Sequence, residues 1–367
     1  MKGALATART GQGTGAGTAP RRPIRLMIVD DSMVARAVLT RMIEFDPNFE
    51  IVAVAGTAEH AIEALGQVTV DTVLLDLEMP GLGGLKSIPR IIQAARGAKV
   101  LIVSSLAEEG AEATVAALAL GAADTLPKPG TGRFNGRFSE VLLGKLRGLG
   151  YADHHPAGAR AVAIAPLQHQ SDAPLKLLAI GASTGGIHAL GTFFAALPER
   201  IGVPILVTQH LPPPFMAVFA RQLSVAANRE AVVAEDGMKL LPDRIVIAPG
   251  EAHLVVEEFG GVPIARLLKA RASSGCMPSV DPMFASAAGL FGASALGIVL
   301  TGMGRDGLEG ARRLVEAGGA VMAQDERSSA VWGMPRSVAE AGLACAILPP
   351  EKLARRVAGR VQEGSCK

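Results

Sequence analysis

Short apolar runs recur along this 367-residue chain, and each is followed by a turn or by a segment with an apolar stripe at helical spacing. Alternation of this kind predicts parallel strands joined by crossover helices. In the first third of the chain the predicted strands are Ile24–Val29, Ile51–Ala55, Thr72–Leu75, Val100–Val103 and Ala123–Leu126. We therefore expect a doubly wound five-stranded α/β domain over residues 23–147.

The first predicted helix covers Ser32–Phe45. Ser32 is of the residue type that caps helix amino ends. An apolar face is expected to contain Val34, Val38, Met42 and Ile43.

A second α/β domain, with a mostly parallel doubly wound sheet, is expected over residues 175–361. Turn-forming residues from Gly150 onward interrupt the pattern, so residues 148–174 are interpreted as a linker with some order around Val162 to Ile164. Residues 1–22 are rich in Gly, Thr, Ala and Arg and predict a disordered tail, and residues 362–367 are taken as a C-terminal tail.

Composition excludes several classes of protein. Apolar residues make up 49% of the chain, but no uncharged run reaches the roughly 18 to 20 residues that cross a bilayer, so membrane insertion is not expected. The net charge of +2 does not favour nucleic acid as a partner. Cys276, Cys345 and Cys366 lack the CxxC spacing of a zinc site, and they indicate no disulfide framework. A cytoplasmic location is expected.

Polar side chains cluster at the predicted strand ends of the first domain. Asp30 and Asp31 follow the first strand, Asp76 the third, Ser104 the fourth and Lys128 the fifth. Taken singly, the aspartates fit helix caps and the lysine a surface charge. Together they would converge at one sheet edge, where crowded carboxylates favour a divalent hard cation such as Mg²⁺.

This constellation resembles the receiver domain of two-component response regulators, which has a flavodoxin-like fold. The resemblance implies that Asp76 accepts the phosphoryl group and that Mg²⁺ lies against Asp30, Asp31 and Asp76. It further implies that Ser104 is the hydroxyl switch and that Lys128 contacts the phosphate.

The second domain places a serine, a histidine and an aspartate after three apolar runs. Ser183 lies in Gly181-Ala-Ser-Thr-Gly-Gly186, His210 follows Gln209, and Asp306 lies in Gly302-Met-Gly-Arg-Asp-Gly307. The preceding runs are Leu177 to Ile180, Ile205 to Val207 and Ile298 to Leu300. Strands of one parallel sheet would bring the three residues to one edge, as a nucleophile, its general base and the group that orients the base.

Each of these residues also has a structural interpretation. The glycine-rich turn at Ser183 fits a structural or phosphate-binding turn, although no Gly-Lys-Ser/Thr follows it as in a P-loop. His210 alone would more often be structural, and Asp306 is placed to cap the predicted helix Leu308–Glu316. The order Ser, His, Asp differs from that of α/β-hydrolases.

Longer motifs favour the catalytic interpretation, because in order they resemble those of the CheB family of chemotaxis methylesterases and glutamine deamidases. They are Gly181–Gly186, Gln209-His-Leu-Pro212, Ala248-Pro-Gly250, Pro278-Ser-Val-Asp281, Leu300–Gly307, Ala323-Gln-Asp-Glu326 and Val331-Trp-Gly-Met-Pro335. With the receiver-like domain, the resemblance covers residues 24–361. Cys276-Met277 stands where His-Arg is more usual, which would alter affinity for an acidic receptor helix.

The resemblance implies a Ser183–His210–Asp306 triad with the Met303 main-chain N–H as an oxyanion donor, and no cofactor for the ester chemistry. The implied substrates are methyl esters and selected glutamines of methyl-accepting chemotaxis receptors, with a histidine kinase of the CheA type as phosphoryl donor. Two alternatives remain open. One is a non-catalytic regulator that binds receptors or a kinase, and the other is an esterase of small molecules.

Overall fold

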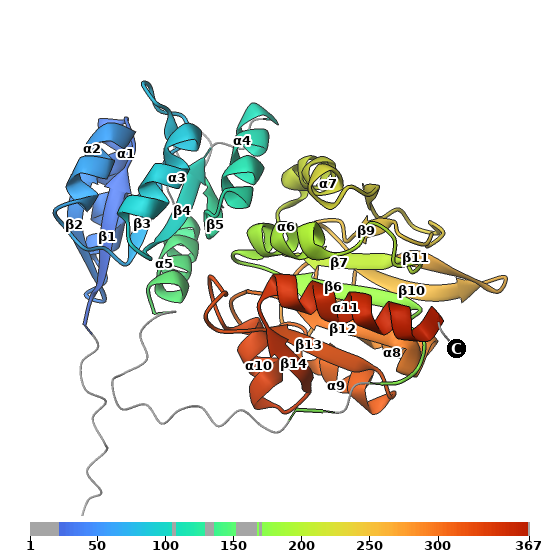
Figure 1. Ribbon diagram of the computed structural model, residues 1–367. Helices are drawn as coiled ribbons and strands as arrows, with labels where there is room; N and C mark the ends of the chain where they lie inside the picture. The colour runs from blue at the N-terminus through green and yellow to red at the C-terminus, as the bar shows by residue number, and fades with distance from the viewer. Residues whose placement is uncertain (1–21, 105–107, 129–135, 152–166, 169–170, 366–367) are drawn as a thin grey trace, which may run out of the picture.

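The protein contains two parallel sheets, each covered by helices on both faces (Figure 1). The computed structural model describes residues 22–104, 108–128, 136–151, 167–168 and 171–365. The expected tail over residues 1–21, the expected order around Val162 to Ile164, and Cys366 all lie outside these residues.

The first sheet has the strand order β2-β1-β3-β4-β5, and every ladder is parallel. Its strands are β1 (Ile24–Val29), β2 (Phe49–Ala55), β3 (Thr72–Leu75), β4 (Lys99–Ser104) and β5 (Asp124–Pro127). The helices are α1 (Met33–Glu44), α2 (Ala58–Leu65), α3 (Gly84–Ala94), α4 (Glu108–Ala119) and α5 (Gly136–Gly150). The five strands expected from the sequence are confirmed to within about two residues, and so is the doubly wound topology.

Helix α1 begins as predicted, and its predicted apolar face is buried or partly buried except at Val34. Ser32 caps it, because its Oγ accepts a hydrogen bond of 3.2 Å from the Ala35 N–H. The apolar face predicted to include Val34 was wrong at that residue, which is 72% exposed, whereas Leu39 and Ile43 are buried. Five residues turn a helix by about 140° beyond a full turn, so Val34 and Leu39 cannot face the same core.

The second sheet has the order β14-β13-β12-β6-β7-β9-β8, again with parallel ladders throughout. Its strands are β6 (Leu177–Ala182), β7 (Ile205–Gln209), β8 (Ala231–Val233), β9 (Ile245–Ile247), β12 (Ala295–Val299), β13 (Ala320–Gln324) and β14 (Ala344–Leu348). An antiparallel hairpin, β10 (His253–Phe259) and β11 (Val262–Leu268), lies outside it. The parallel sheet expected for this half is therefore confirmed.

Helices α6 (Gly186–Ala196), α7 (Pro213–Ala227) and α11 (Pro350–Ser365) cover one face of this sheet, and α8 (Val280–Phe291), α9 (Leu308–Glu316) and α10 (Met334–Glu340) cover the other (Figure 1). A short 3₁₀ turn, Gly292–Ser294, precedes β12. The residues predicted to form the apolar stripe of α6 and the turn after it are all buried, namely Ile187, Leu190, Phe193, Phe194 and Leu197.

Two segment ends differ from the sequence-based expectation. Residues 148–150, expected in the linker, complete α5, and residues 362–365, expected in the C-terminal tail, belong to α11. Within the part of the chain that the structure describes, no helix has the length and apolar character needed to cross a membrane.

Helices α8 and α9 cross closely, and the loop that contains Asp306 leads directly into α9. A Cβ atom at Gly310 would lie 2.7 Å from the Asp281 carbonyl oxygen and 2.7 Å from the Phe284 Cβ. By contrast, a Cβ atom at Gly289 of α8 would meet nothing within 4 Å. The contact at Gly310 therefore leaves no room for a side chain.

We expect Gly310→Ala to lower the free energy of unfolding by about 1–3 kcal/mol, because the two helices must separate. Gly289→Ala is the matched control and should raise it by about 0.5–1 kcal/mol, because alanine is the better helix former. Urea unfolding of both variants measures the difference. Equal effects at the two positions would contradict the close α8–α9 crossing.

Candidate functional site

Three neighbouring strands carry the predicted serine, histidine and aspartate to one edge of the second sheet. Ser183 follows β6, His210 follows β7, and Asp306 lies in the loop after β12, and β6 pairs with both of the other strands. The His210 N–H donates a 3.0 Å hydrogen bond to the Ala182 carbonyl, which joins two of these strand ends directly.

His210 and Asp306 are in direct contact. His210 Nε2 lies 2.7 Å from Asp306 Oδ2, and the Asp306 side chain is almost fully buried. The Ser279 hydroxyl donates to Asp306 Oδ1 at 2.6 Å, and the Val280 N–H donates to Asp306 Oδ2 at 2.8 Å. All of these partners favour a charged carboxylate over a neutral one.

The charge state of Asp306 follows from these partners. Burial by itself would raise the pKa of Asp306, but the hydrogen bond and charge of His210, with the Ser279 and Val280 donors, hold it well below its usual range. Neighbouring Asp281 behaves oppositely, because burial and the charge of Asp306 raise its pKa to about 6. Of the two acids, Asp306 is therefore the one that stays ionised in weak acid.

Asp306 does not cap the following helix. The N-cap of α9 is Gly307, which has a φ of 89° and makes no side-chain cap bond. The capping interpretation of Asp306 is therefore excluded. Two of the donors to Asp306 lie within the motif Pro278-Ser-Val-Asp281. The sequence alone assigned no role to Ser279 or Val280, because their contact with Asp306 depends on the position of the α8 amino end.

Ser183 lies at a tight turn between β6 and α6. Its N–H donates to the Thr301 carbonyl at 3.0 Å, and its carbonyl accepts a 2.9 Å hydrogen bond from Gln209 Nε2. A Cβ atom at Gly302 would lie 2.8 Å from the Ser183 Cβ, so the glycine-rich loop after β12 approaches the serine closely. The sequence identified Gln209 only as part of a motif, and the structure shows that its side chain hydrogen-bonds to the serine turn.

The loop after β12 also presents a main-chain donor. The Gly302 carbonyl accepts hydrogen bonds from the N–H groups of Gly333 and Met334, which fixes the start of this loop. Among the described residues no acceptor pairs with the Met303 N–H, and Gly304 adopts a left-handed φ of 90°. An unpaired N–H in the loop that approaches the serine makes Met303 a candidate oxyanion donor.

In the first domain, Lys128 bridges two buried aspartates. Its Nζ lies 2.7 Å from Asp76 Oδ2 and 3.0 Å from Asp30 Oδ2. Burial alone would lower the pKa of Lys128, but Asp76 and Asp30 outweigh it and raise that pKa. Burial raises the pKa of Asp76, against the opposing effect of Lys128.

The acidic residues here suit a hard cation. Carboxylate oxygens of Asp30, Asp31 and Asp76 all lie within 4.8 Å of one another. Asp30 and Asp76 are buried, and Asp31 is exposed. Three carboxylate oxygens at this spacing fit Mg²⁺.

Ser104 lies at the end of β4, where its carbonyl accepts a 2.8 Å hydrogen bond from the Lys128 N–H. It is buried, and its Oγ lies 2.6 Å from the Thr114 Oγ1 of α4. The structure therefore brings Asp30, Asp31, Asp76 and Lys128 together, and it links the Ser104 hydroxyl to the helix that contacts the other domain.

The first domain packs directly against the serine turn of the second. The Gly185 N–H donates to the Ala123 carbonyl at 2.6 Å, and Thr184 Oγ1 donates to Asp124 Oδ2 at 2.8 Å. Helix α4 packs on α6 and α7, and a 2.8 Å ion pair joins Glu112 to Arg221. These helices face each other in Figure 1.

As a result, the cavity beside the serine and histidine is nearly closed. It measures about 10 Å³, room for about one water molecule. Residues of the first domain supply part of its wall, namely Leu118, Ala122, Ala123 and Asp124. This volume is too small for a substrate side chain.

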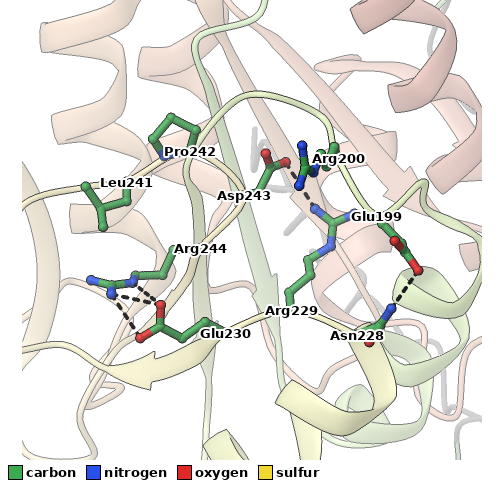
Figure 2. A pocket seen from close by; sticks show the side chains of 9 residues that line it. All are labelled: Glu199, Arg200, Asn228, Arg229, Glu230, Leu241, Pro242, Asp243 and Arg244. Atoms are coloured by element: carbon green, nitrogen blue, oxygen red, sulfur yellow. Dashed lines mark hydrogen bonds and ion pairs between the residues drawn. The ribbon is translucent and has the colours of Figure 1, made fainter.

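A larger pocket of about 470 Å³ lies at the opposite, amino-terminal edge of the second sheet (Figure 2). Its charged groups neutralise one another: Arg244 pairs with Glu230, and Arg229 with Asp243. Arg229 is buried, which lowers its pKa, and it also donates to the Pro198 carbonyl. These contacts join the loops before β7, β8 and β9, so we interpret the pocket as structural.

Comparison with known proteins agrees with this architecture. Residues 178–357 match the family model described as CheB methylesterase, and residues 26–133 match that of the response regulator receiver domain. The protein-glutamate methylesterase/protein-glutamine glutaminase 2 of Caulobacter vibrioides is 40% identical over 345 residues, which cover 92% of this chain and 99% of that protein. An Azospirillum brasilense protein-glutamate methylesterase/protein-glutamine glutaminase is 37% identical over 364 residues, which cover 92% of each chain.

Among solved structures, the catalytic domain of Thermotoga maritima CheB methylesterase is 35% identical, with a TM-score of 0.49, and the match covers 51% of this chain and 99% of that one. Because similarity to the curated relatives runs through both halves at nearly full length, this chain belongs to the CheB family of methylesterases, in which a receiver domain precedes the esterase.

Proposed function

We propose that this chain hydrolyses γ-glutamyl methyl esters of methyl-accepting chemotaxis receptors and deamidates selected receptor glutamines, with Ser183, His210 and Asp306 as its triad. The observation that carries the proposal is the buried 2.7 Å contact between His210 and Asp306 at the strand end next to Ser183. Residues 175–361 are the proposed esterase unit and residues 23–147 the proposed receiver. The proposed location is the cytoplasm.

Each group has one step in this proposal. Because His210 donates its Nε2 proton to Asp306, the neutral ring keeps its lone pair on Nδ1, which accepts the Ser183 proton as the hydroxyl attacks the ester carbonyl. The Met303 N–H stabilises the developing oxyanion. The proton then passes to the leaving methanol, or to ammonia when the substrate is a glutamine.

Water completes the cycle. His210 takes a proton from a water molecule that attacks the acyl-serine, and Ser183 recovers its hydroxyl as the glutamate carboxylate is released. Throughout, Asp306 stays ionised, because its pKa is lowered, and its negative charge stabilises the imidazolium. Every step uses side chains and main-chain groups of this chain.

The receiver regulates this site in our proposal. Asp30, Asp31 and Asp76 would hold Mg²⁺, and Asp76 would accept a phosphoryl group from a histidine kinase of the CheA type. The cation would offset the negative charge of the carboxylates and the phosphoryl group. Ser104 and Lys128 would respond to the phosphoryl group, and Ser104 is already bonded to Thr114 of α4.

The unphosphorylated receiver acts as a brake in this scheme. It walls the catalytic cavity and leaves about 10 Å³ beside Ser183 and His210. Movement of α4 on phosphorylation would release the contacts with α6 and α7 and favour an open arrangement.

Ser183→Ala should abolish methanol release from methyl-labelled receptors, with a loss of about 10⁴- to 10⁶-fold, because the nucleophile oxygen is gone. The variant should unfold at the wild-type urea concentration, since the serine contacts that hold the turn come from its main chain. A folded variant that keeps a tenth of wild-type turnover would show that another group is the nucleophile, or that the ester activity lies elsewhere.

Asp306→Asn should lower turnover by roughly 10⁴-fold, because an amide does not stabilise the imidazolium and favours the wrong tautomer of His210. Steady-state methanol release measures the effect. The matched control is Asp281→Asn, which retains an oxygen acceptor for the Gly310 N–H and leaves the contact between His210 and Asp306 intact. Similar losses in the two variants would argue against a specific role for Asp306.

Gly148→Leu should raise demethylation by the unphosphorylated full-length protein several-fold. A Cβ atom at Gly148 would lie 2.1 Å from the Met303 Sδ, so a leucine must displace the Met303 side chain or move α5 away from the esterase loop. Gly144→Leu, one turn earlier on α5, meets nothing within 4 Å and should leave the basal rate unchanged. Equal basal rates in the two variants would contradict a brake that acts through the contact between α5 and Met303.

A further inference from the structure

A cysteine lies beside the catalytic pair. One ligand atom each from Cys276, His210 and Asp306 can be chosen so that all three lie within 4.8 Å of one another. Cys276 is on the loop between β11 and α8 and is partly exposed, so an ion from solvent can reach its thiol. No step of the proposed mechanism uses this side chain.

Hydrogen bonds hold the cysteine loop against the triad. The Ser274 Oγ accepts from the Cys276 N–H at 3.3 Å and donates to the Ser279 Oγ at 3.2 Å. Ser279 in turn donates to Asp306, and its N–H donates to His253 Nδ1 at 2.9 Å. The thiol is therefore placed by the same residues that position the catalytic aspartate.

The donor set is that of a zinc site. Thiolate, imidazole and carboxylate together suit Zn²⁺, whereas Mg²⁺ prefers oxygen ligands only. Ligand atoms of one tetrahedral zinc lie roughly 3.3 to 3.8 Å apart, so shifts of about 1 Å would close the site. Three protein ligands leave the fourth position for water.

We infer that Cys276, His210 and Asp306 form an inhibitory site for a thiophilic divalent cation, with Zn²⁺ the best match. Binding transfers the Cys276 proton to solvent and forms a metal–sulfur bond, with no oxidation or reduction. A neutral imidazole has one lone-pair nitrogen, and the metal occupies it. The other nitrogen then carries the proton, so His210 cannot accept one from Ser183, whichever nitrogen binds.

The Cys276 thiol is protonated in the absence of a metal, so the thiolate ligand forms only when a metal binds. Burial and the charge of Asp306 raise the pKa of the Cys276 thiol. Without metal it is therefore the neutral thiol, which does not compete with Ser183 as a nucleophile. A bound zinc would displace the proton.

The inhibition rests on the proposed role of His210, but metal binding does not, so the two are measured separately on the full-length protein under reducing conditions. Binding is followed by titration with Co²⁺, whose thiolate complexes absorb by charge transfer, and by displacement with Zn²⁺. Turnover is followed as methanol release at buffered free Zn²⁺, with each variant referred to its own zinc-free rate.

Zinc should inhibit the wild type reversibly, with activity restored by a chelator. Cys276→Ser should lose the corresponding thiolate absorption and require about 100-fold more free Zn²⁺ for half inhibition, because a ligand is lost. Cys345→Ala is the control; this buried cysteine is on β14, and its loss should leave both readouts as in the wild type.

Equal zinc sensitivity and unchanged cobalt absorption in Cys276→Ser and the wild type would overturn the site. Absorption that depends on Cys276, together with turnover that zinc does not affect, would overturn the inhibition. That second result would also place the fault in the role assigned to His210 rather than in the metal ligands.

Discussion

The buried contact between His210 and Asp306 is the interaction on which the rest of the catalytic structure depends. A carboxylate removed from water is unfavourable unless donors surround it. Asp306 receives donors from His210, Ser279 and the amino end of α8. Moving any of these elements would deprive a buried charge of one of its donors, so the loop after β12 and α8 must keep their relative positions.

Close packing serves the same end. Gly310 allows α9 to approach the first turn of α8, and Gly302 allows the following loop to approach Ser183. Main-chain contacts between neighbouring strand ends thus hold the loops that carry Ser183 and Asp306. This arrangement suits a serine enzyme, whose rate depends on preorganised donors.

The receiver contacts the turn that contains Ser183. Ala123 and Asp124 bond to the two residues that follow Ser183, while the Ser104–Thr114 contact links the receiver's own strand ends to α4. A single helix therefore contacts both a hydroxyl at the end of β4 and the wall of the catalytic cavity. The two domains share a face that includes α4 and the cavity wall beside Ser183, and this face is where the proposed brake would act.

The sequence by itself determined the two α/β halves, their parallel strands and the residues at the strand ends. This was possible because apolar runs and helical periodicity are local signals, and because parallel strands bring their carboxyl ends to one edge. Local patterns also predicted the Ser32 cap and the buried stripe of α6. They failed at Val34, where the choice of buried face depends on the sheet beneath the helix.

Only the tertiary structure decided which long-range partners those residues meet. Asp306 fitted a helix cap in sequence, yet it bonds to His210, 96 positions away. The roles of Ser279 and Gln209, the place of Cys276 beside the triad, and the contact of Gly148 with Met303 depend on loops and domain faces that come together only after folding. Such contacts leave no periodic signal in the chain, because they join segments through space.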